Sequence, residues 1–89
     1  MKEKLTTEEY KEIERLAGSA LNAPNKAEAQ KYISKIKSFG YGLEGRVGNI
    51  FNELVCCVEN ASGRVTDKDN KAYYVTMELS KLRTYGVEK

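Results

Sequence analysis

The sequence predicts an all-α fold, a small bundle of about four helices that forms a single domain over residues 1–89. Apolar residues recur at three- and four-residue intervals in successive segments, which is the period of an amphipathic helix. Helix-capping residues stand directly before two of those segments. A chain of 89 residues has room for one small core, so a second domain is not expected.

The first helix is predicted to begin at Thr6 and Thr7. Thr6 and Glu9 have the spacing of a capping box, and the acidic residues of the first turn complement the helix dipole. Its apolar stripe consists of Tyr10, Ile13, Leu16, Ala17, Ala20 and Leu21. The helix should stop before Pro24, because proline disfavours helical geometry in the residue before it.

Two further helices follow from the same period. Asn25 and Glu28 have the spacing of a second capping signature, and Gly40 is predicted to end that helix as its carboxyl-terminal cap. The stripe of the second helix is Ala29, Tyr32, Ile33, Ile36 and Phe39. The stripe of the third helix is Leu43, Val47, Ile50, Phe51, Leu54, Val58 and Ala61, and Gly63 is predicted to cap it.

Residues 72–80 have two competing periods. Apolar and polar residues alternate from Tyr73 to Leu79 as they would in a strand. The helical interpretation puts Ala72, Val75, Leu79 and Leu82 on one face, with Thr66 or Asp67 as cap and Gly86 beyond the end. Helix is favoured because a lone strand has no partner elsewhere in the chain. The last two helices would then form an antiparallel hairpin across residues 62–65, in a protein expected to be oligomeric.

Composition excludes several functional classes. Fifteen basic against thirteen acidic residues give a net charge of +2, which is too low for a dedicated nucleic-acid binder. No apolar run is long enough to span a membrane. The chain has no His, so the commonest general base and metal ligand are missing, and no catalytic, metal or cofactor site is predicted.

The cysteines and the amino terminus suggest a cytoplasmic protein. Cys56 and Cys57 are the only cysteines and are adjacent, so a disulfide between them would need a strained ring that a helix cannot accommodate. Reduced thiols fit a cytosolic compartment. The first ten residues lack the apolar core of a signal peptide, so export is not expected.

The glycine-rich segment at residues 40–48 is the candidate binding site. Residues 40–45 read G-x-G-x-x-G, but a helix precedes them where the dinucleotide-binding fingerprint requires a strand. Glycines at a helix amino terminus can still leave backbone N–H groups free for an anion, and residues 31–46 carry a local +3. The residues predicted to bind an anionic ligand are Lys35, Lys37, Gly40, Tyr41, Gly42, Gly45 and Arg46.

The same glycines also have a purely structural interpretation. Gly40 would be a helix cap, Gly42 a turn residue, and Gly45 and Gly48 would let the third helix pack closely against a neighbour. A glycine inside a helix costs about 1 kcal/mol relative to Ala, so each of these positions calls for a reason. The sequence alone leaves both interpretations open.

Two function hypotheses follow from these features. In the first, a non-enzymatic helical oligomer holds a small anionic ligand, such as a nucleotide or nucleotide messenger, with Tyr41 stacked on its base. In the second, the chain is an interaction module that inhibits or assembles a larger partner, with Tyr73 and Tyr74 at the interface. Small chains rich in Lys and Glu and without catalytic signatures are similar in style to bacteriophage accessory proteins, including nucleotide-sequestering and CRISPR-inhibiting ones, although no residue motif assigns this chain to them.

Overall fold

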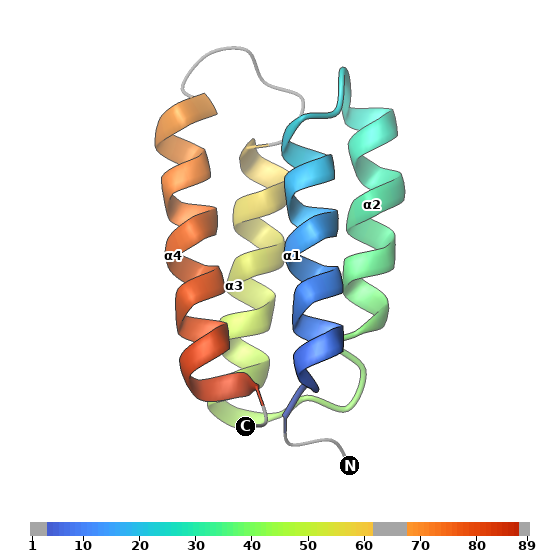
Figure 1. The fold of residues 1–89 in the computed structure, drawn as a ribbon. Coiled ribbons are helices and arrows are strands. Elements are labelled where there is room, and N and C mark those ends of the chain that lie inside the picture. The colour runs from blue at the N-terminus through green and yellow to red at the C-terminus, as the bar shows by residue number, and fades with distance from the viewer. Residues whose placement is uncertain (1–3, 62–67, 88–89) are drawn as a thin grey trace.

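The computed structural model describes residues 4–61 and 68–87, and the side chains from residue 73 onward in the second range. Within them the chain forms four helices, α1 (Thr7–Leu21), α2 (Lys26–Ser38), α3 (Gly45–Ala61) and α4 (Lys68–Gly86), and no strand of a sheet. The all-α prediction is therefore confirmed. The helices stand side by side in a bundle 37 Å long and about 20 Å across, with α1 packed on α2 and α3 packed on α4 (Figure 1).

The predicted starts of α1 and α2 are confirmed by their caps. The Thr6 hydroxyl accepts a hydrogen bond from the Glu9 backbone N–H at 3.1 Å, and the Glu9 carboxylate accepts one from the Thr6 N–H at 2.9 Å. The Asn25 side chain accepts from the Glu28 N–H at 2.9 Å. These caps satisfy backbone donors that the first turn of a helix leaves without a partner.

Residues 72–80 are helical, as the favoured of the two interpretations predicted. Val75 is 1 % exposed and Tyr73 is 66 % exposed, so the alternation of apolar and polar residues does not follow burial. α3 and α4 run in opposite directions along each other (Figure 1). The predicted connection at 62–65, the Gly63 cap and the Thr66 or Asp67 cap lie outside the described residues.

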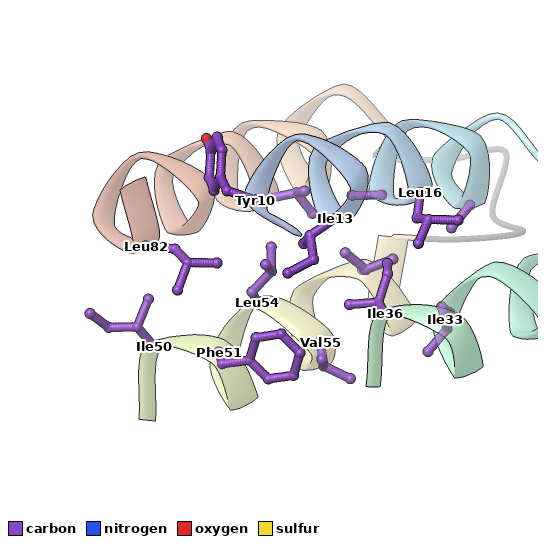
Figure 2. Packing of buried hydrophobic residues seen from close by; sticks show 14 of the residues in the cluster. Tyr10, Ile13, Leu16, Ile33, Ile36, Ile50, Phe51, Leu54, Val55 and Leu82 are labelled. Atoms are coloured by element: carbon purple, nitrogen blue, oxygen red, sulfur yellow. The ribbon is translucent and has the colours of Figure 1, made fainter. Parts of the chain in front are cut away.

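One core runs through the bundle, and every helix contributes to it (Figure 2). Leu5, which precedes α1, is fully buried, and its backbone N–H donates to the Gly86 carbonyl at 2.7 Å. This bond ties the segment before α1 to the end of α4. The largest fully buried side chains are Leu5, Ile13, Leu16, Ile33, Ile36, Leu54, Val58, Val75 and Leu82.

Gly86 does not lie beyond α4 but is its last residue. A Cβ atom there would come within 2.8 Å of Leu82 Cδ1 and 3.0 Å of Val47 Cγ1. A side chain at Gly86 would therefore crowd both Leu82 of the same helix and Val47 of α3, and the absence of a side chain leaves room for them.

Candidate functional site

The turn between α2 and α3 depends on two glycines with left-handed backbone geometry. Gly42 has φ 88° and Gly45 has φ 64°, conformations that strain residues with a Cβ atom. The Leu43 N–H donates to the Gly40 carbonyl at 3.1 Å and closes the turn. No atom lies within 4 Å of a Cβ built on Gly45, so its backbone angle explains this glycine and close helix packing does not.

Gly40 and Gly48 are needed for space, although not for the reasons predicted. α2 ends at Ser38 with Phe39 as its cap, and Gly40 is not among the described glycines of positive φ, so the predicted cap at Gly40 is wrong. A Cβ on Gly40 would lie 2.3 Å from Phe51 Cε1, and one on Gly48 would lie 2.8 Å from the Leu43 carbonyl oxygen. Gly48 thus accommodates the preceding turn and not a neighbouring helix.

An open groove of about 420 Å³ lies where the end of α2 and the turn meet α3. That volume is at the lower end of the range of small-molecule sites, about 300–1,000 Å³. Its lining residues are Lys37, Gly40, Tyr41, Phe51, Asn52, Val55 and Cys56. Because Gly40 has no side chain, the Phe51 ring can approach the backbone of the turn and form part of the groove wall.

The polar and aromatic groups of the groove are accessible. Tyr41 is 81 % exposed, so both the ring and the hydroxyl can meet a ligand. Lys37 Nζ lies 3.1 Å from Glu59 Oε1 on α3, and the two side chains are 52 % and 37 % exposed. An exposed ion pair contributes little to stability, so an anionic ligand can compete with Glu59 for the ammonium group.

The other predicted ligand-binding residues lie away from the groove lining. Arg46 turns toward α4, with its guanidinium carbon 5.1 Å from the centre of the Tyr85 ring, a cation–π contact. Lys35 lies on the side of α1, where its charge adds to the effect of the Arg15 hydrogen bond in lowering the pKa of Glu12. Lys37, Gly40 and Tyr41 are thus brought together, whereas Lys35 and Arg46 are directed elsewhere and Gly42 and Gly45 serve the turn.

The two predicted interface tyrosines are on the surface of α4. Tyr73 is 66 % exposed and Tyr74 is 53 % exposed. Their ring centroids are 5.7 Å apart at an interplanar angle of 74°, an edge-to-face pair. Paired aromatic rings that remain in water are available to a partner surface.

The sequence analysis missed a buried carboxylate. Glu78 is 3 % exposed, its Oε1 accepts a hydrogen bond from Lys81 Nζ at 3.1 Å, and its Oε2 has no partner. The hydrogen bond to Glu78 raises the pKa of Lys81. Helical spacing could have revealed this position, because residue 78 lies three after Val75 and four before Leu82 on the same face.

The adjacent cysteines belong to different surfaces. Cys56 is exposed and lines the groove, whereas Cys57 is half-buried toward α4. Burial raises the pKa of the Cys57 thiol, and the charge of Glu78 raises it further. The two thiols therefore lie on two separate faces of α3.

No group of three His, Cys, Asp or Glu side chains suited to a metal ion occurs within residues 4–61 and 68–87. Over the same ranges no helix has the length and apolar character needed to cross a bilayer. Comparisons with protein-family profiles, with curated proteins and with solved structures find no match to the chain.

Proposed function

We propose that the chain is a non-enzymatic helical binding protein that sequesters a small planar ligand bearing an anionic group, of the nucleotide or nucleotide-messenger class. The observation that carries the proposal is the exposed Tyr41 ring at a groove of about 420 Å³ that also holds Lys37 and Asn52. A nucleotide has the three features that these side chains can meet, namely a flat base, a hydrogen-bonding base edge and a phosphate.

Stacking on Tyr41 would supply most of the affinity. Base–aromatic stacking contributes about 1–3 kcal/mol per base by alanine substitution, and it tolerates any base because every base has a π-face. The Phe51 and Val55 side chains add apolar wall area. Asn52 has both a donor and an acceptor, so its amide can pair with a base edge.

The charge of the groove limits the ligand to few phosphates. Lys37 is the one cationic residue among those that line it. The groove also adjoins the carboxyl end of α2, where the helix dipole disfavours accumulated negative charge. A nucleoside monophosphate therefore fits the groove better than a triphosphate does.

Isothermal titration calorimetry with nucleoside monophosphates and cyclic dinucleotides tests the proposal. Tyr41→Ala should weaken binding, and Tyr73→Ala, which removes another exposed tyrosine, is the matched control. Lys37→Ala should weaken it more than Lys35→Ala does. An Arg46→Ala variant that abolishes binding would move the site to the start of α3, and a protein that binds no nucleotide would contradict the proposal.

A second candidate function is that of a helical interaction module that inhibits or assembles a larger partner, such as a CRISPR inhibitor or a host-takeover factor. The exposed edge-to-face pair of Tyr73 and Tyr74 favours it, since tyrosine is enriched at protein interfaces. Tyr73→Ala should then reduce recovery of the partner in a pull-down at an unchanged melting temperature. Full recovery of the partner would argue against this face.

The proposal extends to assembly and location. We infer that α3 and α4 form an antiparallel hairpin, that copies of the chain associate into a homo-oligomer, and that the protein acts in the cytoplasm of a phage-infected cell as an accessory or anti-defence protein. Two free thiols at Cys56 and Cys57 agree with a reducing compartment. Native mass spectrometry of the protein from its host would report subunit number and retained ligand in one spectrum.

A further inference from the structure

The surface where α3 and α4 meet carries a row of charged and aromatic side chains, here called the α3–α4 seam. Its residues are Arg46, Glu53, Cys57, Tyr74, Glu78, Lys81 and Tyr85. At one end, Arg46 lies over the Tyr85 ring at 5.1 Å. In the middle, Lys81 Nζ bonds to Glu78 at 3.1 Å, and the charge of Glu53 also acts on Lys81.

The buried carboxylate of the seam is not explained by the packing of one copy. The Glu78 side chain is 5 % exposed and one oxygen has no partner, although an apolar residue would fill the same place without an unpaired oxygen. Glu78 instead holds the ammonium group of Lys81, and the Lys81 side chain is 45 % exposed. Glu78 is thus a positioning residue that presents a fixed cation on the seam.

The seam carries exposed charges of both signs. Two cations, Arg46 and Lys81, lie beside the exposed carboxylate of Glu53, whereas the carboxylate of Glu78 is buried and bonded to Lys81 of its own chain. Two other charged side chains that the structure describes on these helices act elsewhere, since Glu59 pairs with Lys37 of α2 and the charge of Arg83 acts on Tyr10 of α1.

Aromatic residues stand toward both ends of the seam. Tyr85, at one end, is 48 % exposed. Tyr74 is 53 % exposed and lies eleven residues from Tyr85, a spacing that returns to about the same face of a helix. Along the seam, Arg46 and Tyr85 therefore stand at one end, Glu53 and Lys81 lie in the middle, and Tyr74 stands at the other end.

We propose that the α3–α4 seam binds a second copy of this chain about a twofold axis. A twofold interface places the same patch on both subunits, so it requires a surface that is complementary to itself. Turned end for end, each copy brings its Lys81 to the exposed Glu53 carboxylate of the second copy and its Tyr85 end to the Tyr74 end of that copy. This inference rests on the self-association in the proposed function and is independent of ligand binding in the groove.

Analytical ultracentrifugation of the full chain and its variants tests the seam. The wild type should sediment at twice the chain mass of 10.0 kDa. Glu53→Arg should raise the dimer dissociation constant about tenfold or more through like charges, and Tyr85→Ser should also raise it. Glu44→Arg and Tyr41→Ser are the controls, because they change exposed residues of the same two types outside the seam and should leave the dimer intact.

Three sedimentation results are decisive. Loss of the dimer in the seam variants alone, with unchanged helicity by circular dichroism, supports the seam. A dimer that survives both seam substitutions overturns the seam while leaving self-association in place. A wild type that stays at 10.0 kDa up to millimolar concentration overturns the seam and the oligomer together.

The two cysteines provide a second measurement that leaves the seam charges unchanged. In the Cys56→Ser variant the remaining Cys57 lies in the seam, so its labelling by iodoacetamide should slow as protein concentration rises. In the Cys57→Ser variant the remaining Cys56 lies in the groove, and its labelling rate should stay constant. Equal behaviour of the two thiols would overturn the proposed interface.

Discussion

Replacing Glu78 by Met should stabilise the single chain. The unpaired Oε2 is sealed from water, and an unsatisfied buried acceptor costs about 1–3 kcal/mol. The substitution also removes the hydrogen bond from Lys81, but that ammonium reaches solvent and water replaces the bond. Met has a similar length and fills the site with apolar atoms, so the net gain should be about 1 kcal/mol.

Urea denaturation followed by circular dichroism measures this gain, at concentrations low enough for the chain to be a single copy. The midpoint should rise with no change in the slope of unfolding free energy against urea. The melting temperature should rise by about 4–8 °C per kcal/mol for a domain of this size. Glu78→Gln is the control, since it keeps a buried polar group without a full set of partners and should not stabilise.

A loss of stability of 1 kcal/mol or more in Glu78→Met would refute this reasoning, because it would mean that the carboxylate is well satisfied in the folded chain. The same variant should weaken the dimer, since Lys81 loses the group that positions it. A gain in folding stability with a loss in association is the combination expected of a residue kept for function.

The remaining predictions concern the turn, the core and the first cap. Gly40→Ala should destabilise by about 1–3 kcal/mol in urea melts, because its Cβ would meet Phe51 at 2.3 Å, whereas Gly18→Ala, with no atom within 4 Å, should stabilise by about 0.5–1 kcal/mol. Equal effects of the two would contradict the assigned clash. Burial and the hydrogen bond to a neighbouring carboxylate raise the pKa of Tyr10 to about 12 from 10.0, so its contribution to stability should be complete below pH 10 and lost as pH rises to about 12. Unfolding free energies at pH 9 and 11.5 test this, and Tyr10→Phe should show a smaller decline. Thr6→Ala should cost about 1 kcal/mol through loss of the cap at α1, and a change below 0.3 kcal/mol would argue against the cap.

Sequence reasoning succeeded where one local rule determined the outcome. The caps at Thr6 and Asn25 use a side-chain oxygen at a fixed distance along the chain from the N–H that it accepts, so the pattern is visible in the sequence. The buried stripes follow from helical period, and only their partly exposed margins, such as Tyr32 and Leu79, differ from full burial.

The glycines show what local rules do not contain. A glycine needed for positive φ, such as Gly42, and one needed for space, such as Gly40, have the same letter in a sequence. Phe51, which requires the space at Gly40, is eleven residues away in another helix. Whether a glycine is needed for its backbone angle or for space therefore depends on tertiary packing.

Only part of the candidate site could be predicted from the sequence, because the rest of it depends on how the helices pack. Lys37, Gly40 and Tyr41 are close in sequence and share the groove, but its other wall comes from Asn52 and Cys56 of α3. Charges close in sequence also spread around the helices that carry them, because successive residues turn by about 100°.

The stacking role of Tyr41 is the central claim, and calorimetric titration of a nucleoside monophosphate into the wild type, Tyr41→Ala and Tyr73→Ala tests it most directly. The wild type and Tyr73→Ala should bind alike, and Tyr41→Ala should bind about tenfold more weakly or worse, as the loss of one stacked base implies. Binding that survives unchanged in Tyr41→Ala, or that is absent from the wild type, would contradict the claim.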